Sequence, residues 1–196
     1  EVSHALMNNN QIFGLFLEGL ESISPEVAKN LAKHKGAWLY LGIRQITPEV
    51  AKELVKSQSE IIGFARLEQI TPEVAHILAG SNHALSFDNL KEISPEVARI
   101  LMTHELALFL NGLEILTPEL SQALVTQDRH YLDFSKVKTI TPEKAVILAK
   151  HTGGLVLGLN ELTPEMARIL IGYQGNSLSF PEIHEISSET QAILSK

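Results

Sequence analysis

A tripeptide of Ser or Thr, then Pro, then Glu recurs along this chain at intervals of 22–24 residues. The complete copies occupy residues 24–26, 47–49, 71–73, 94–96, 117–119, 141–143 and 163–165. A degenerate eighth copy reads Ser187, Ser188, Glu189, and seven of the eight prolines fall within the motif. Such spacing is typical of a repeat protein, in which one short unit is stacked along an axis.

Each tripeptide has the chemistry of a helix start. The hydroxyl suits the N-cap, proline suits the first helical position, and glutamate favours the positive end of the helix dipole. A leucine lies five residues after each glutamate, at Leu31, Leu54, Leu78, Leu101, Leu124, Leu148, Leu170 and Leu194. Upstream lies a short alternating apolar run, as at residues 15–17, 85–87, 108–110 and 178–180, which predicts a strand. Each unit is therefore a strand followed by a helix that is too short to be stable alone.

The units predict an α/β fold, a single solenoid array of about eight repeats over residues 1–196. We interpret residues 1–14 as a truncated N-terminal repeat, because Glu1 and Leu6 match the helical Glu and Leu positions. Residues 15–177 are then the central repeats, and the chain is expected to be an excerpt of a longer array. The last unit, residues 178–196, is either a degenerate ordinary repeat or a polar capping repeat.

The repeat pattern Leu-x-Leu-x-x-Leu-x-x-Ile-Thr-Pro-Glu-x-Ala-x-x-Leu resembles the bacterial leucine-rich repeat proteins over nearly the whole chain. The resemblance implies a leucine-rich-repeat solenoid, a right-handed horseshoe or arc with parallel strands on the concave face and short helices on the convex face. Geometry agrees, because strands stack about 4.8 Å apart while packed helices need about 8–10 Å. The resemblance also implies a non-enzymatic surface that binds protein or glycan, and it slightly favours the cell surface or secretion.

The chain departs from the familiar repeat at one turn. Aliphatic residues such as Leu67 and Leu113 stand where that pattern carries Asn or Cys, so an aliphatic ladder is expected to fill the turn. Two units lack one residue here, and each has a glycine, Gly42 or Gly158. We expect these glycines to absorb the deletion through a backbone φ that other residues avoid.

Composition excludes several functions. With 16 Lys+Arg against 23 Asp+Glu, the net charge of −7 makes a broad nucleic-acid-binding face unlikely to form. No run of 18 apolar residues occurs, so no membrane insertion is expected, and the absence of cysteine excludes thiolate chemistry. The spacing of acids, bases and glycines predicts no catalytic residue, metal or cofactor. His34, His104 and His151 share one repeat position, where a basic group suits a helix C-terminus.

Alternation along the strands predicts which side chains face the concave side. The candidate ligand-binding residues are Phe16, Glu18, Tyr40, Ser86, Asp88, Phe109, Asn111, Asp133 and Ser135. Among them Phe16, Tyr40 and Phe109 are the expected aromatic anchors for a protein or glycan partner. Two other interpretations stay open: the rings pack on neighbouring strands, or the array is a structural spacer or cell-surface element without a specific ligand. A monomer is expected, with end-to-end contacts through the truncated ends as the alternative.

Overall fold

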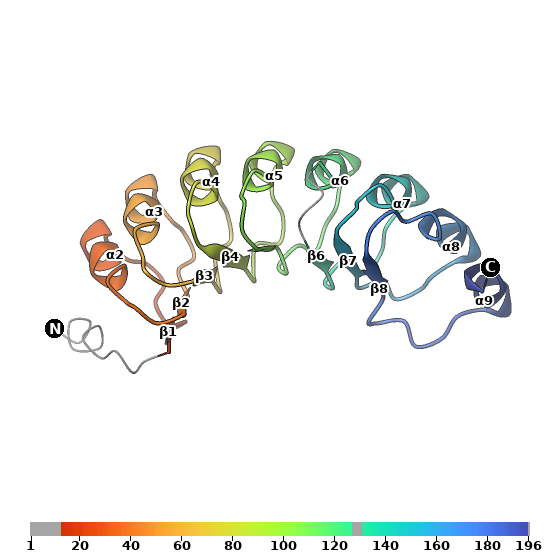
Figure 1. The fold of residues 1–196 in the computed structure, drawn as a ribbon, viewed down its shortest axis with the longest axis horizontal. Helices are drawn as coiled ribbons and strands as arrows, with labels where there is room; N and C mark the ends of the chain where they lie inside the picture. The colour runs from red at the N-terminus through yellow and green to blue at the C-terminus, as the bar shows by residue number, and fades with distance from the viewer. Residues whose placement is uncertain (1–12, 127–130, 196) are drawn as a thin grey trace.

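The structure is a computed structural model that describes residues 13–126 and 131–195. Strands and helices alternate along an arc, with the helices on its outer side and the strands on its inner side (Figure 1). The strands are β1 (Gly14–Leu17), β2 (Trp38–Leu41), β3 (Ile61–Phe64), β4 (Ala84–Phe87), β5 (Leu108–Phe109), β6 (Leu132–Phe134), β7 (Gly154–Leu157) and β8 (Ser177–Ser179). The helices are α2 (Pro25–Leu31), α3 (Pro48–Leu54), α4 (Pro72–Ala79), α5 (Pro95–Leu101), α6 (Pro118–Leu124), α7 (Pro142–Leu148), α8 (Pro164–Leu170) and α9 (Ser188–Leu194). The predicted α/β solenoid of about eight repeats is confirmed, while the proposed truncated repeat falls almost entirely outside the described residues.

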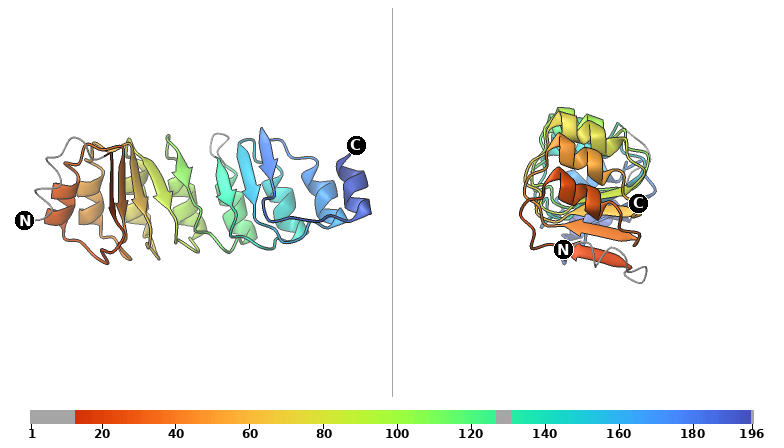
Figure 2. Two further views of the ribbon diagram at one scale, coloured as in Figure 1. Left: turned by 90° about the horizontal axis from the view of Figure 1, so that it is seen from below. Right: turned by 90° about the vertical axis from the view of Figure 1, so that its left-hand side faces the viewer.

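The strands pair in parallel, each with the strand of the next repeat. The strands β1 to β5 form one sheet and β6 to β8 a second, and within the described residues no ladder joins β5 to β6. Both groups line the same face of the molecule (Figure 2). The register aligns equivalent repeat positions, so that Leu15 lies opposite Leu39 and Leu39 opposite Ile62. Each outward side chain therefore joins a row that crosses the concave face.

The helix starts follow the predicted chemistry. In each helix from α2 to α9, the N-cap hydroxyl accepts a hydrogen bond from the backbone N–H three residues later. The distance is 3.2 Å from the Val27 N–H to Ser24 Oγ, and 3.1 Å from the Thr190 N–H to Ser187 Oγ. The second case shows that the hydroxyl caps α9 although Ser188 replaces the proline. The residues that form the cap lie within three positions of one another, so the sequence alone specifies it.

The core is a set of apolar ladders between the strands and the helices. The leucine five residues after each motif glutamate is at most 3% exposed from Leu31 through Leu170. The predicted aliphatic ladder fills the turn, because Ile43, Leu67 and Leu113 are fully buried. Phe64 and Phe87 stack on each other within the core, with ring centroids 5.4 Å apart. Each repeat thus completes its core only against its neighbours.

The prediction for Gly42 and Gly158 is wrong in its mechanism. No described glycine has a positive φ. Instead, a Cβ on Gly42 would overlap the carbonyl group of Glu18, and one on Gly158 would overlap that of Ser135. The Gly42 N–H donates to the Leu17 carbonyl oxygen at 3.0 Å. The shortened turn therefore brings the backbones of two repeats together, and glycine is required by that close approach.

The last described unit keeps the repeat pattern, but its apolar side chains are less buried than those of the central repeats. Leu194 is 44% exposed, although the equivalent leucines of the other repeats are buried, and Ile186 is 40% exposed, although its equivalents are buried or partly buried. Thr190 is fully buried, and its hydroxyl donates to the Leu162 carbonyl oxygen at 3.2 Å. The apolar side chains on this unit differ from the polar outer face that a capping repeat presents.

Candidate binding surface

The parallel register places five of the nine candidate residues in two rows, one on each sheet. Phe16, Tyr40, Gly63, Ser86 and Phe109 follow one another across the first sheet. Asp133, Val156 and Ser179 continue this position across the second sheet. This alignment agrees with the alternation along each strand. It does not guarantee exposure, since Ser86 is only 3% exposed and offers almost no surface to a ligand.

Four aromatic rings gather at the N-terminal end of this face. We call Phe13, Phe16, Trp38 and Tyr40 the aromatic platform. Trp38 meets Phe13 edge to face at a centroid distance of 5.1 Å and Phe16 in the same manner at 6.1 Å, while Phe16 stacks on Tyr40 at 5.5 Å. Phe13, Phe16 and Trp38 are 67%, 52% and 38% exposed. Such contiguous apolar exposure is uncommon on a soluble protein and typical of an interaction surface.

Two glycines give the platform its shape. A Cβ on Gly63 would overlap the ring of Tyr40, so this ring lies across the next strand. A Cβ on Gly14 would come within 2.7 Å of the Phe16 ring and 3.3 Å of the Trp38 ring. The Tyr40 ring therefore lies over Gly63 of the neighbouring strand, and the Phe16 ring lies over Gly14 of its own strand, at positions that lack a side chain. This ordering reduces the conformational entropy that the rings lose when a partner binds.

The sequence analysis missed half of the platform. It selected Phe16 and Tyr40 but passed over Trp38 and Phe13. Trp38 has the same parity as Tyr40 in its strand, so extending the alternation by one residue would have found it. Phe13 precedes β1 and joins the platform only through its contact with Trp38, for which the sequence has no local signal.

The third predicted anchor, Phe109, lies apart from the platform. It stands three strands beyond Tyr40 in the register, it is partly exposed, and it stacks on no other ring among the described residues. The proposed set of three anchors is thus one cluster and one isolated ring. A single ligand would have to extend along the arc to contact both.

The remaining candidates form a polar region over β4 to β6, and Glu18 stands alone and exposed at the end of β1. Ser86 donates to Asp88 Oδ1 at 2.8 Å, and the Ser135 N–H donates to Asp133 Oδ1 at 2.9 Å. Lys136 reaches across from the next sheet and donates to the Asp88 carbonyl oxygen at 2.7 Å. Asn111 Oδ1 is buried and has no partner within the described residues. Most of these polar groups already bond to one another, so they offer fewer free contacts than the platform.

The histidines have a role that the sequence did not predict. The structure buries all three that share one repeat position, namely His34, His104 and His151. The two ring nitrogens of His104 lie 2.9 Å from the Ala79 carbonyl oxygen and 2.8 Å from that of His83. His83 makes the same kind of contact, with Nδ1 2.7 Å from the Ser59 carbonyl oxygen. His83 and His104 therefore each bridge two backbone carbonyl groups of preceding units, a contact that depends on tertiary structure.

The motif glutamates behave as helix-start residues. In Glu49 and Glu119, a hydrogen bond from the residue's own backbone N–H lowers the carboxyl pKa, and the hydroxyl of the N-cap threonine lowers it further. Both carboxylates are exposed. Among the described residues, no three acidic, histidine or cysteine side chains are grouped to hold a metal ion.

No family model and no curated protein matches this chain. No helix in the described part of the chain has the length and apolarity needed to cross a lipid bilayer. Function must therefore be argued from the surface itself, and the aromatic platform is its most distinctive feature.

Proposed function

We propose that this protein is a non-enzymatic binding module of the leucine-rich repeat type, which recognises a protein partner through its concave sheet. The observation that carries the proposal is the exposed aromatic platform of Phe13, Phe16, Trp38 and Tyr40. Aromatic residues dominate the energetic centres of protein interfaces, because each ring buries a large area at a small entropic cost. Parallel strands on the inner side of an arc supply a rigid base for such a centre.

The packing of the rings favours a protein over a glycan. A sugar ring stacks on an open aromatic face, but the faces of Phe16 and Tyr40 are turned toward each other, with an interplanar angle of 24°. Trp38 packs nearly perpendicular to Phe13 and Phe16, with interplanar angles of 76° and 71°. The accessible surface of the rings is apolar and uneven, so it is suited to contact aliphatic or aromatic side chains of a partner.

The alternative is a structural spacer without a specific ligand, and one observation favours it. Two strands beyond the platform carry small residues in the rows of Trp38 and Tyr40, namely Gly63 in β3 and Ala84 in β4. Such a face offers few side chains that could contact a ligand. The two functions differ in one measurable respect: a binding module loses its partner when the platform is truncated, and a spacer has no partner to lose.

Trp38 provides the test, because it is the one tryptophan in the sequence and lies within the platform. A random peptide library displayed on phage is selected against the wild-type protein, and the enriched peptides are titrated while Trp38 emission is recorded. The double variant Phe16→Ala/Tyr40→Ala keeps this reporter and removes its neighbours. Ile171→Ala is the matched control, since Ile171 is 50% exposed at the end of α8 and far along the chain.

We expect the enriched peptides to contain apolar anchors, to shift the emission of Trp38, and to bind the double variant about tenfold or more weakly. Ile171→Ala should bind them as the wild type does. Failure to enrich any peptide, or equal binding by the wild type and the double variant, would refute recognition through the platform and favour the spacer.

A further inference from the structure

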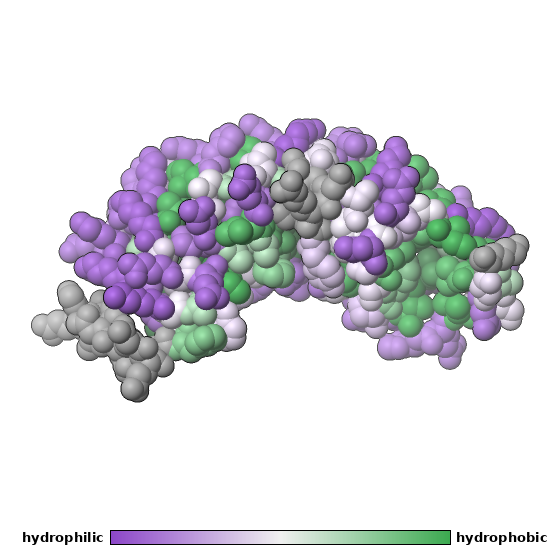
Figure 3. Space-filling model, in the orientation of Figure 1, coloured by the Kyte–Doolittle hydropathy of each residue, from purple (hydrophilic) through white to green (hydrophobic). Residues whose placement is uncertain are grey.

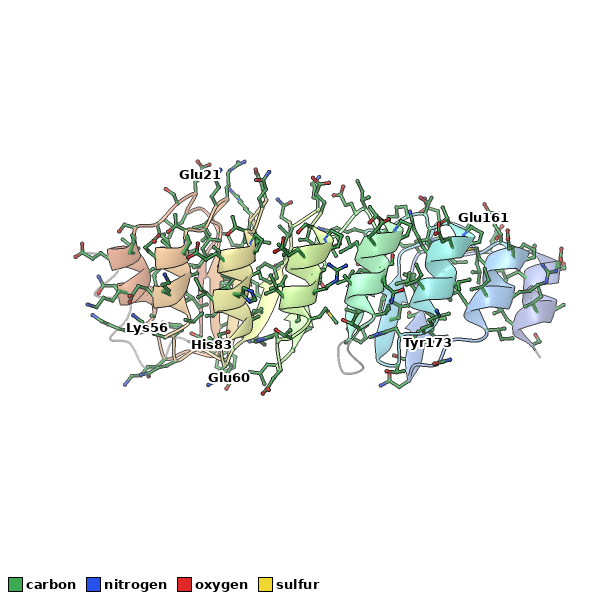
Figure 4. The ribbon with its side chains drawn as sticks, turned by 90° about the horizontal axis from the view of Figure 1, so that it is seen from above. Glu21, Lys56, Glu60, His83, Glu161 and Tyr173 are labelled. Carbon is green, nitrogen blue, oxygen red and sulfur yellow. The ribbon has the colours of Figure 1, made fainter. Side chains whose placement is uncertain are left out.

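The outer side of the first two repeats carries a concentration of lysines that the repeat itself does not require. We define the lysine patch as Lys29, Lys33, Lys35, Lys52 and Lys56, and all five are exposed. They belong to α2, α3 and the turns that follow these helices. Figure 3 shows a hydrophilic surface over this end of the arc, and Figure 4 places Lys56 on the rim opposite Glu21.

The side chains of the patch surround a shallow depression between two repeats. Its volume is about 360 Å³, and its lining includes Lys29, Lys33, Lys35 and Lys56. Glu53 is the acidic residue in that lining, and its Oε1 lies 2.6 Å from Lys56 Nζ. Lysines outnumber this carboxylate four to one around the depression, so the field there is positive.

Helix capping alone does not explain these lysines, because the other repeats are internal controls. The position seven residues after the motif glutamate is a lysine in the first, second and sixth repeats (Lys33, Lys56 and Lys150), but it is Gly80, Thr103, Thr126 and Gly172 in the other four complete repeats. Each of these positions directly follows the end of its helix or lies one residue beyond it. If the negative end of the helix dipole required a cation there, the requirement would apply to every repeat.

The lysines of the patch have few strong local partners, and Lys52 interacts electrostatically with Glu49. Lys33 donates to Asn30 Oδ1 at 3.0 Å, which is a neutral acceptor. Lys56 pairs with Glu53, and the side chain of Lys56 is 62% exposed. Exposed pairs of this kind contribute little to folding stability. The positive charge of the patch therefore remains available to a partner.

We propose that the lysine patch binds an acidic polypeptide segment. Helices in contact lie about 8–10 Å apart, and carboxylates two or three residues apart in an extended segment cover about 7–10 Å. An acidic segment can therefore contact lysines of α2 and α3 at once. An extended polyanion fits less well, because the chain without these five lysines would carry a net charge of −12 instead of −7 and would repel it beyond the patch.

The test is a titration of fluorescein-labelled peptides followed by fluorescence anisotropy. The probe is a twelve-residue peptide of alternating Glu and Ser, and its comparison is the same peptide with Lys in place of Glu. A single-stranded DNA oligonucleotide and vesicles that contain phosphatidylserine are the other two probes. The variant is Lys33→Gln/Lys56→Gln, and the matched control is Lys144→Gln/Lys150→Gln, which makes the same change in net charge on α7 and its following turn.

We expect the acidic peptide to bind the wild type with an affinity that falls as salt is added. The patch variant should bind about fivefold or more weakly, while the matched control should bind as the wild type does. Equal loss in both variants would overturn the proposal, since the attraction would then depend on net charge alone. Tighter binding of the DNA or the vesicles would overturn it too, as would no binding of the acidic peptide at low salt.

Discussion

Leu101 gives the sharpest test of the ladder that holds the repeats together. It lies at the end of α5 and is fully buried, so Leu101→Ala removes three carbon atoms from the core. At about 0.8 kcal/mol for each buried carbon, the lost transfer free energy is about 2.4 kcal/mol. The cavity left between neighbouring repeats adds to this, which gives a total loss of about 3–5 kcal/mol in the free energy of unfolding.

The same substitution at Leu194 is the control, because the residue occupies the same repeat position and is 44% exposed. Because a little over half of the Leu194 side chain is buried, only that share of the transfer free energy is lost, and solvent fills the space that the side chain leaves. Leu194→Ala should therefore lower the free energy of unfolding by only about 1 kcal/mol. Both variants are measured by urea unfolding followed by circular dichroism, with the slope of the transition compared as well as its midpoint. Equal losses for the two variants would refute the inward ladder as the source of stability.

Three further predictions concern the turns, the caps and one buried ring. Gly42→Ala should destabilise the protein by about 1–3 kcal/mol in urea unfolding because its Cβ would strike the preceding repeat, while Gly19→Ala, with open space around it, should be nearly neutral. Thr47→Ala should cost about 1 kcal/mol by loss of the α3 cap, and an unchanged midpoint would show that the hydroxyl does not stabilise the helix. Burial lowers the pKa of His34 from its ordinary 6.5, although a hydrogen bond that the His34 ring donates to the Trp38 backbone opposes the shift. The unfolded ring then takes up its proton first, so the stability that His34 contributes is present above pH 6.5 and is lost as the pH falls below it. His34→Gln should flatten this part of a stability profile against pH, and an unaltered profile would contradict the assignment.

The parts of the fold that sequence predicted are those set by local chemistry or by repetition. A hydroxyl, a proline and a glutamate specify a helix start within three residues, so the caps of all described helices follow from the motif. The inward ladders follow from repetition, which shows the same position many times. The role of Gly42 could not be read in this way, because it depends on the distance between two backbones that lie 24 residues apart.

The candidate site was predictable only in part, for a similar reason. Alternation assigned Phe16 and Tyr40 to the concave side, but exposure depends on the neighbouring strands as well. Ser86 is covered although its row faces outward, and Phe13 joins the platform through a ring contact with Trp38. The buried histidines show the same limit, since the carbonyl groups that they bridge belong to earlier repeats.

The interruption of the sheet between β5 and β6 has a mechanical consequence. The helices α5, α6 and α7 pack in succession past this point, while the described residues show no backbone ladder on the strand side. Straightening the arc between β5 and β6 would separate the two sheets without breaking a backbone ladder. Straightening it between any other two successive strands would break the ladder that joins them. We therefore expect the array to bend more easily between β5 and β6 than between other neighbouring strands. A partner long enough to contact both sheets would hold them at one separation. The curvature of the bound protein would then depend on the length of that partner.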